Sequence, residues 1–303
     1  MKVLDVKDLS ELEEKFAIAI GFFDGVHLGH QLVINNAISY AKENHVKSLV
    51  ITFDRSPKIV FGTVENEGYL TPIDEKLRIL KEMGVDYTLV LKFDATFFNL
   101  TADAFINEYL LKIGICYLSV GFDFQFGQGG TGNTDLLLRH GGFKVKVAKP
   151  LMMDGDKVST TRIKNCLKIG ALDLVNQMLG RHFSVNGKVV YGRQLGSTIG
   201  FPTANIKLNE GYLLSLRGVY ATVSYLDDAS FMSMTNIGFN PTLNLQESVS
   251  IETHIFDFDA NIYGKHLRIE FLEKIRDEVR FNNLDELIIQ LEKDKNDVNS
   301  RST

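Results

Sequence analysis

The chain has 303 residues, of which 45% are hydrophobic and 23% are charged, as is usual for a soluble globular protein. This length predicts two domains, because a single hydrophobic core seldom grows much beyond ~250 residues. The formal net charge of −5 and the lack of a basic block disfavour nucleic acid and anionic membranes as partners. The sequence shows neither a signal peptide nor a membrane-spanning apolar run, so a cytoplasmic location is expected.

The N-terminal half alternates short apolar runs with segments of helical periodicity. This alternation predicts a doubly wound α/β domain, in which helices cover both faces of a parallel sheet. In such sheets, ligands bind just beyond the carboxyl ends of the strands. Strands are expected over residues 16–21, 48–53, 87–91, 117–121 and 143–147, and helices over residues 31–43, 74–83, 101–112 and 134–139.

From about residue 181 the pattern changes to short alternating runs that Gly, Asn and Asp separate. These runs predict an antiparallel sheet or small β-barrel, closed by a helix over residues 285–293. The polar residues 294–303 are expected to fray. We therefore expect an N-terminal domain over residues 1–180, ending in a helical segment from residue 162, and a C-terminal domain over residues 181–303. The barrel strands are expected over residues 187–191, 218–225, 231–237, 249–257 and 266–271.

The first chemical motif, Gly21 to Gln31, follows the first expected strand and opens a helix. His27 and His30 are three residues apart, which places them on one face of the first helical turn. A helix N-terminus offers unpaired N–H groups and partial positive charge, which suit a polyphosphate. Gly29 would let a nucleotide approach the backbone closely. From the spacing alone, a pair of ordinary surface or capping histidines is an equally good interpretation.

The string Gly200-Phe201-Pro202-Thr203-Ala204-Asn205 is the most specific in the chain. Pro202 fixes the turn, and Thr203 and Asn205 place two neutral oxygens on one side of an extended segment. Such a pair suits a hard cation such as Mg²⁺. Four glycines between residues 187 and 200 could cradle phosphates through backbone N–H groups, although no Walker motif follows. A capped turn beside a flexible hairpin is the open alternative.

The His-Xaa-Gly-His string resembles the signature of the nucleotidylyltransferase superfamily, and the longer motif resembles the FMN adenylyltransferase module of bacterial FAD synthetases. The phenylalanine-rich residues 120–127 are a further match, and residues 158–164 are similar to the family's triphosphate-binding Ser/Thr-rich motif. The resemblance implies that His27 and His30 stabilise developing charge. It also implies substrate or nucleotide contacts by Gly21, Phe22, Asp24, Gly29, Asp123, Phe124, Ser159, Thr160, Thr161, Arg162 and Lys164.

The C-terminal strings resemble riboflavin kinase: the Pro-Thr-Ala-Asn string, residues 236–238 with Pro241-Thr242, and Glu252 followed by His254 and Asp257. The resemblance implies that Thr203 and Asn205 help to hold the Mg-nucleotide and that Glu252 is the base for the ribityl 5′-hydroxyl. From residue type alone, Glu252 is better explained as a solvated residue on a polar strand face. Further binding residues that the resemblance implies are Gly192, Gly196, Gly200, Pro202, Asn236, Arg276 and Phe281.

Three positions depart from the pattern of the family. Phe22 stands where a small polar residue, often Asn, is usual, and Ser197 stands where the glycine loop often has Arg. Lys164 replaces the usual Arg, so a bidentate phosphate contact becomes a point charge. The loop after Gly127 also lacks the basic residues often found there.

The two motif sets, in this order, identify the sequence as similar to the bacterial bifunctional riboflavin kinase/FMN adenylyltransferase (FAD synthetase) family. The resemblance implies an N-terminal parallel-sheet nucleotidylyltransferase domain and a C-terminal antiparallel β-barrel kinase domain with a closing helix. It implies that riboflavin and ATP give FMN, that FMN and ATP give FAD and pyrophosphate, and that Mg²⁺ is the cofactor. A chain with only the kinase module active, and a non-enzymatic flavin sensor, stay open as alternatives. So does oligomerisation.

Overall fold

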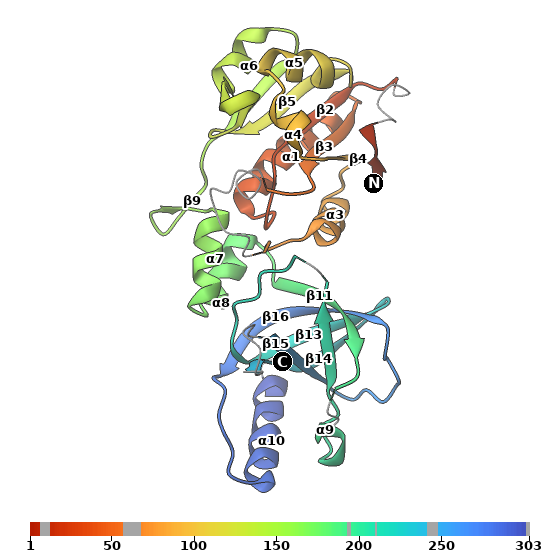
Figure 1. The fold of residues 1–303 in the computed structure, drawn as a ribbon, viewed down its shortest axis with the longest axis vertical. Coiled ribbons are helices and arrows are strands. Elements are labelled where there is room, and N and C mark those ends of the chain that lie inside the picture. Colours follow the sequence, from red (N-terminus) through yellow and green to blue (C-terminus); the bar gives the residue numbers. More distant parts are fainter. Residues whose placement is uncertain (7–12, 57–67, 193–194, 210, 241–247, 301–303) are drawn as a thin grey trace. The chain divides into compact units, whose positions relative to one another are not determined.

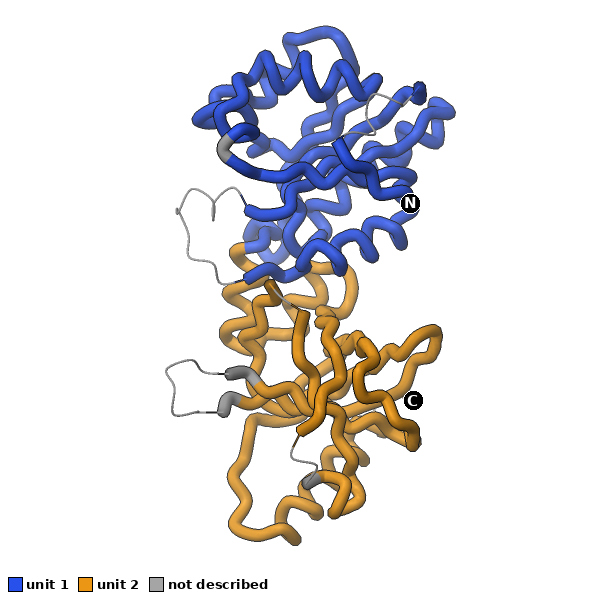
Figure 2. The backbone as a smooth tube through the Cα atoms, turned by 45° about the vertical axis from the view of Figure 1, so that its right-hand side comes forward, with its two compact units in different colours: residues 1–160 blue, residues 161–303 orange. Residues whose placement is uncertain are grey.

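The computed structural model describes residues 1–6, 13–56, 68–192, 195–209, 211–240 and 248–300 (Figure 1). Packing divides the chain into two compact units, unit 1 over residues 1–160 and unit 2 over residues 161–303 (Figure 2). The segment 162–180 packs with unit 2, and the functional boundary between residues 180 and 181 stays a prediction. Among the described residues, none of the helices combines the length and hydropathy that a membrane span requires.

Unit 1 is built on a parallel sheet, as the alternating pattern predicted. Strand β2 lies at its centre, with β3 on one side and β5 on the other, so the chain order reverses there. All five expected strands form; β1 is an addition that is too short to show periodicity. The sheet order is β1 (Lys2–Leu4), β4 (Tyr87–Leu91), β3 (Lys47–Phe53), β2 (Phe16–Ile20), β5 (Ile115–Gly121) and β8 (Lys144–Ala148).

Both faces of this sheet are buried. Phe16, Ile18 and Ile20 of β2 enter one hydrophobic cluster, whereas Ala17 and Ala19 enter another on the opposite face. A continuously apolar strand is what a sheet covered on both faces requires. The covering helices are α1 (Leu28–Glu43), α3 (Ile73–Glu82), α4 (Ala95–Phe98), α5 (Ala102–Ala104), a π-helix (Phe105–Leu110) and α6 (Thr134–His140).

Helix α3 buries a face that is shifted from the expected one and includes two charged residues. The apolar spacing predicted that Leu77, Leu80 and Met83 point inward, but only Leu80 is fully buried, while the other two are half-buried. Glu75 and Lys76 are buried instead, with 3% and 1% of their surfaces exposed. Hydrophobic periodicity cannot place charged residues in a core, because it assigns them to the solvent face by default.

Short elements complete unit 1 and lead into unit 2. Two small hairpins pair β6 with β7 and β9 with β10, and helices α7 and α8 occupy the segment expected to be helical. Their bounds are β6 (Gln125–Phe126), a 3₁₀ turn (Gln128–Gly130), β7 (Gly132–Asn133), β9 (Met152–Met153), β10 (Asp156–Lys157), α7 (Thr160–Lys168) and α8 (Leu172–Leu179).

Unit 2 is a closed antiparallel β-barrel with a C-terminal helix, which confirms the predicted fold class. The five expected strands form, and β12 adds a sixth that the sequence did not reveal. The barrel order is β11 (Phe183–Val190), β12 (Ala204–Leu208), β15 (Ser248–Ile255), β14 (Ala229–Asn240), β13 (Gly218–Leu226) and β16 (His266–Arg276), with α9 (Leu195–Thr198) and α10 (Leu284–Ser300) outside the strands.

A chain of fully buried hydroxyls links β13, β14 and β15. Thr222 Oγ1 lies 2.8 Å from both Ser233 Oγ and Thr235 Oγ1. The chain continues to Ser224 at one end and to Thr253 at the other, over 2.8 and 3.0 Å. Because each hydroxyl can donate and accept, these side chains bond to one another and to the backbone carbonyls of Thr222 and Ser233.

Helix α10 is longer than predicted. Fraying was expected from Asp294 onward, but the helix continues to Ser300. Asp294 is fully buried and paired with Arg276 of β16, with Nη2 to Oδ2 at 2.7 Å. Val298 is also fully buried, in a cluster with Phe201. The expectation of fraying was therefore wrong for residues 294–300. The segment is polar, but one of its charged residues, Asp294, belongs to a buried ion pair.

Candidate functional site

Two of the N-terminal motifs begin at the carboxyl ends of strands in the sheet of unit 1. The first follows β2, and residues 122–124 follow β5. Strands β2 and β5 pair in parallel, with Ala19 opposite Ser119. Their carboxyl ends are therefore neighbours at the point where the strand order reverses, which is where open α/β sheets bind ligands.

The loop after β2 has a strained backbone. Phe23 and Val26 adopt φ values of 52° and 39°, and Gly25 adopts 87°. A β-branched residue such as Val26 rarely takes a positive φ. Gly21 is needed here, since a Cβ atom on it would lie 2.7 Å from the ring of Phe23. Strain of this kind persists only where the surroundings hold it, and it gathers at functional sites.

His27 and His30 lie together at the start of α1. The rings are stacked, with centroids 3.6 Å apart and an interplanar angle of 17°. His27 is the N-cap, and its Nδ1 accepts a hydrogen bond from the backbone N–H of His30 at 3.3 Å. An accepting Nδ1 places the hydrogen of the neutral ring on Nε2. A Cβ atom on Gly29 would lie 3.2 Å from the His27 ring, so this glycine makes room for the histidine.

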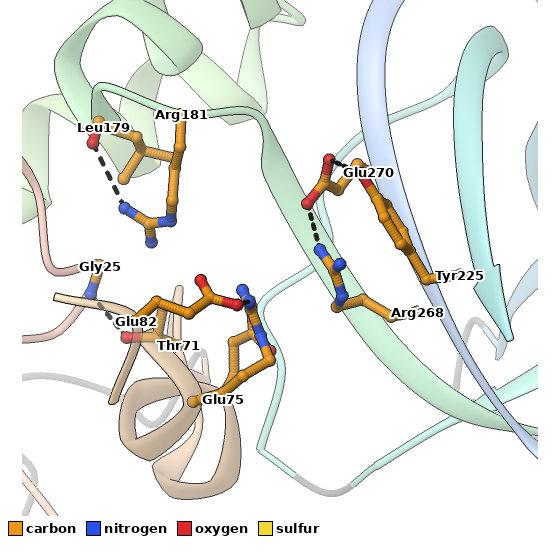
Figure 3. A network of polar contacts seen from close by, with 10 residues as sticks. Gly25, Thr71, Glu75, Glu82, Leu179, Arg181, Tyr225, Arg268 and Glu270 are labelled. Atoms are coloured by element: carbon orange, nitrogen blue, oxygen red, sulfur yellow. Dashed lines mark hydrogen bonds and ion pairs between the residues drawn. The ribbon is translucent and has the colours of Figure 1, made fainter. Parts of the chain in front are cut away.

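The structure joins the Ser/Thr-rich string to this loop. The Thr160 hydroxyl donates to the backbone carbonyl of Asp24 at 2.9 Å. The buried Asp24 carboxylate accepts from the backbone N–H of Thr71 at 3.1 Å. The backbone N–H of Gly25 in turn donates to the Thr71 hydroxyl at 2.8 Å (Figure 3). Asp24 and Thr160, both predicted binding residues, therefore also hold the loop in place.

The remaining predicted residues of this site lie on the loop after β5, in the Ser/Thr-rich string and on α7. Asp123 is exposed and pairs with Lys157 at 3.0 Å. Phe124 is half-buried and stacks on Phe126, with ring centroids 5.6 Å apart. Ser159 is half-buried in unit 1. Exposed Thr161 and half-buried Arg162 and Lys164 follow on α7, within unit 2.

Three residues that contact this loop were missed from the sequence. They are Thr71, described above, and Thr52 and Lys76, both of which bind the carbonyl of Phe22. One signal existed in the sequence: Lys76 lies four residues before the core residue Leu80 and therefore on the same face of α3. A charged residue on an apolar face is a candidate for a buried, functional role.

Four of the predicted kinase residues share one row of the barrel of unit 2. Glu252 of β15 lies opposite Asn205 of β12 on one side and Asn236 of β14 on the other. The row continues through Val219 of β13 to Arg276 of β16. Residues opposite each other across a sheet point to the same face, with Cβ atoms about 5 Å apart. The barrel therefore brings Glu252 beside both asparagines.

The glycine loop packs closely against the Pro-Thr-Ala-Asn string. A Cβ atom on Gly192 would overlap the side-chain amide of Asn205. A Cβ atom on Gly196 would overlap the carbonyl oxygen of Phe201. The Cβ position of Gly196 is also 3.4 Å from Thr203 Oγ1. Gly200 ends the loop with a φ of 82°. These glycines allow the loop to approach the backbone and side chains of the string.

His254 fixes the turn at Pro202. Its Nδ1 lies 2.7 Å from the carbonyl oxygen of Pro202, and because that oxygen only accepts, the imidazole is the donor. The ring also lies against Phe201, with centroids 5.3 Å apart. Burial lowers the pKa of His254, so the neutral form is favoured. The sequence placed His254 in the motif without a role, and its position indicates support of the turn.

The C-terminal predicted residues are engaged in structural contacts. Arg276 binds Asp294 through Nε and Nη2, and its guanidinium lies 5.9 Å from the ring centre of half-buried Phe281. Glu278 packs against Gly238: a Cβ atom on Gly238 would lie 2.6 Å from the Glu278 carboxylate. These contacts keep the segment beside the row that holds Asn236. Pro241 and Thr242 lie outside the described residues.

The oxygen atoms of Thr203 and Asn205 fit the predicted Mg²⁺. Both residues are half-buried, which leaves room for water ligands. Among the described residues, no cluster of three or more His, Cys, Asp or Glu side chains is arranged to hold a metal. Mg²⁺ prefers oxygen ligands, usually keeps several waters and commonly binds substrate phosphates. The donor set is therefore suited to Mg²⁺ that arrives with a nucleotide.

A separate hollow of about 500 Å³ lies in unit 2. Its cationic side chains would suit an anion, but Lys274 already pairs with Asp277 at 2.6 Å. The hollow contains none of the residues predicted for either site. It is lined by Lys168, Ile169, Gly170, Leu214, Ser215, Arg217 and Lys274.

Known proteins match both units. A family model described as FAD synthetase matches residues 9–162, and one described as riboflavin kinase matches residues 179–301. The chain is 38% identical to the bifunctional riboflavin kinase/FMN adenylyltransferase of Listeria monocytogenes, over 92% of this chain and 90% of that protein. It is 35% identical to the protein of the same name from Bacillus subtilis, over 95% of this chain and 92% of that protein.

A solved structure matches along the whole chain. It is titled as a macrolide-efflux protein from Streptococcus pneumoniae, with a TM-score of 0.89, 29% identity and 98% coverage of both chains. That title describes the other protein, and the likeness bears on the fold of this one. The order of the two family matches is the order that the sequence motifs predicted. The chain belongs to the family of bifunctional riboflavin kinases/FMN adenylyltransferases.

Proposed function

We propose that the chain carries out the two reactions of its family at two separate sites, one in the N-terminal domain of residues 1–180 and one in the C-terminal domain of residues 181–303. The kinase site is formed by Glu252 with Thr203 and Asn205. The adenylyltransferase site is formed around His27 and His30. Riboflavin and ATP give FMN and ADP at the first, and FMN and ATP give FAD and pyrophosphate at the second. The observation that carries this proposal is the register that places Glu252 opposite Asn205 and Asn236.

In the kinase step, the Glu252 carboxylate accepts the proton of the ribityl 5′-hydroxyl as that oxygen attacks the γ-phosphorus of ATP. The bond from the γ-phosphorus to the bridging oxygen breaks, and ADP leaves. Asn205 and Asn236 are uncharged, so they orient groups without opposing the charge of the base. Mg²⁺ held through Thr203 and Asn205 would neutralise phosphate charge. The glycine loop, with Gly192, Gly196 and Gly200, would follow the phosphate chain through its backbone.

In the adenylyltransferase step, a phosphate oxygen of FMN attacks the α-phosphorus of ATP in line, and pyrophosphate leaves. Charge accumulates on the phosphate oxygens, and preorganised donors that face this charge lower the barrier. We assign this role to the N-terminus of α1 and to His27 and His30. Ser159 and Thr160 would contact the triphosphate, and the roles of Thr161, Arg162 and Lys164 rest on the family resemblance.

The site positions also support roles for the other predicted residues. The loop between β2 and α1 contains Gly21, Phe22 and Asp24, and Gly29 lies in the first turn of α1. We propose that this segment contacts the nucleotide. Asp123 and Phe124 stand at the same sheet edge and would contact substrate. Pro202 would fix the turn that carries the metal ligands, while Arg276 and Phe281 would border the flavin of the kinase site. We place the functional boundary at residues 180/181, close to residue 179, where the riboflavin kinase match begins.

Chromatographic product analysis tests the two-site proposal. The full chain is given riboflavin, or FMN, with ATP and Mg²⁺, and FMN, FAD and pyrophosphate are measured over time. Glu252→Gln should form almost no FMN from riboflavin but should convert supplied FMN to FAD. His27→Ala should accumulate FMN. Glu292→Gln and His140→Ala, both at exposed positions, are the matched controls. A Glu252→Gln variant that phosphorylates riboflavin like the control would remove the assigned base.

A further inference from the structure

Lys76 is a buried cation that contacts the loop of the first motif. Only 1% of its surface is exposed. Its Nζ donates to the backbone carbonyl of Phe22 at 2.6 Å and to Thr52 Oγ1 at 3.3 Å. The same Nζ lies 4.2 Å from the centre of the Phe22 ring. Thr52 Oγ1 also donates to the Phe22 carbonyl, at 3.0 Å. The Phe22 carbonyl thus accepts two hydrogen bonds, one from Lys76 and one from Thr52.

Burying this ammonium is unfavourable for folding. Burial lowers the pKa of Lys76 to about 8, and the charge of Asp24 opposes this shift only in part. Strand β3 contributes the uncharged hydroxyl of Thr52. On α3 itself, the buried Glu75 binds Arg78 through both carboxylate oxygens, at 2.6 and 3.0 Å. An apolar side chain of similar length would fit such a position at lower cost.

The bound carbonyl belongs to the strained loop. Phe22 immediately precedes Phe23, whose φ is 52°, and the loop leads directly into the N-cap His27. Strained backbone holds its shape only when surrounding contacts determine it. Thr71 and Thr160 fix the later part of the loop, at Gly25 and Asp24. At its start, the described contacts to the Phe22 carbonyl come from Lys76 and Thr52.

We infer that Lys76 is a positioning residue for the adenylyltransferase reaction, and the inference rests on the proposed function of unit 1. Its ammonium holds the Phe22 carbonyl and thereby sets the direction in which His27 and the N-terminus of α1 face the nucleotide. The cation contributes through the backbone and does not touch the substrate. Displacements of about 1 Å at a reacting centre can cost on the order of 100-fold in rate.

This role predicts opposite effects on activity and on stability. Replacing Lys76 with Met keeps the stem and removes the buried charge. We expect Lys76→Met to lower kcat for FAD formation by about 10- to 100-fold. Its thermal midpoint should equal or exceed that of the parent, because the variant no longer buries a charge. A residue with a merely structural role would lose activity only in proportion to the protein unfolded.

The pH dependence gives a second, independent readout. The folded pKa of Lys76 lies below the ordinary value of 10.5, so between about pH 8 and 10.5 the unfolded chain binds more protons at this residue. Stability should therefore rise with pH across that interval. FAD formation should fall in the parent as Lys76 loses its charge above about pH 8. Lys76→Met should lack both changes.

The experiment compares the full-length parent with Lys76→Met, Thr52→Val and Lys81→Met. Lys81 is an exposed lysine of the same helix and serves as the matched control. The measurements are kcat and KM for ATP in FAD formation, the thermal midpoint, and the pH profiles of both. Riboflavin kinase activity in the same samples reports the amount of active unit 2, and the thermal midpoint reports the folding of the variant. Thr52→Val leaves the ammonium in place and should lose less activity than Lys76→Met.

The expected result is a fall in kcat that Lys76→Met shows and Lys81→Met does not, without loss of stability or of kinase activity. Values of kcat within twofold for the two lysine variants would overturn the inference. So would a loss that follows a lowered thermal midpoint, since this would indicate a structural role. If Lys76→Met does not fold, parental FAD formation that does not fall above about pH 8 would overturn it. A parent that forms no FAD would instead refute the proposed function itself.

Discussion

The two candidate sites are built in different ways. In unit 2, Asn205, Glu252 and Asn236 occupy neighbouring positions on barrel strands, and the register of the sheet brings them together. In unit 1, His27 lies after a loop with positive φ values, which contacts from Thr52, Thr71, Lys76 and Thr160 hold in place. A site on strands inherits its geometry from the fold, whereas a site after a strained loop depends on its supports.

The largest expected effect separates the two sites. Glu252→Gln should lower FMN formation by about 100- to 10,000-fold, the usual contribution of a positioned general base. FAD formation from supplied FMN should stay at the parental rate, because His27 and its loop belong to unit 1. Both rates are measured by chromatography, with Glu292→Gln as control. Equal losses in both reactions would contradict two independent sites.

His27→Ala should affect the other reaction. Loss of one preorganised stabilising group costs about 100- to 1,000-fold in kcat. The variant also loses an N-cap, which costs about 1 kcal/mol of stability. FAD formation and the thermal midpoint are measured beside those of His140→Ala. If FAD formation changed no more than the control, His27 would be a cap alone.

Arg276 tests whether the C-terminal helix supports the kinase row. Its partner Asp294 has a side chain that is 1% exposed. Arg276→Met would leave a buried carboxylate without its cation, which should cost about 3 kcal/mol or more. Urea unfolding of this variant is compared with that of Arg280→Met, at an exposed position. A change below about 1 kcal/mol would mean that Asp294 finds water or another donor.

The smallest expected effect concerns the buried hydroxyls of the barrel. Thr222→Val conserves shape but leaves Ser233 and Thr235 with one hydrogen-bond partner fewer. We expect a loss of about 1–3 kcal/mol in unfolding free energy, with kinase kcat close to parental. Ser230→Ala, at an exposed position of β14, should stay within about 0.5 kcal/mol of the parent. If Thr222→Val had the same unfolding free energy as the parent, the hydroxyl chain would add no net stability.

Much of the fold could be predicted because hydrophobic periodicity reports burial directly. The central strand from Phe16, the helix that begins before residue 31 and the alternating barrel strands all follow from it. Strand parity also placed Thr203 and Asn205 on one side of the chain. Strand β12 was missed because its sequence ANIKL contains the polar residues Asn205 and Lys207 and buries only Ile206.

The supports of the sites could not be predicted in the same way. Lys76, Glu75 and Asp294 are charged, so a pattern based on hydropathy assigns them to solvent, although each is buried. Their burial depends on partners far away in the sequence, such as Phe22 for Lys76 and Arg276 for Asp294. A single sequence does not reveal such pairs. The motif strings identified the groups proposed for the chemistry, and the structure identified what holds them.

Mixing two defective variants tests the central claim of two separate sites most directly. Glu252→Gln and His27→Ala are each incubated with riboflavin, ATP and Mg²⁺, and then together in one tube. Neither variant alone should form FAD at an appreciable rate. The mixture should form it, because FMN made by His27→Ala is adenylylated by Glu252→Gln. A mixture that forms no FAD, or a single variant that forms it at the parental rate, would contradict the account.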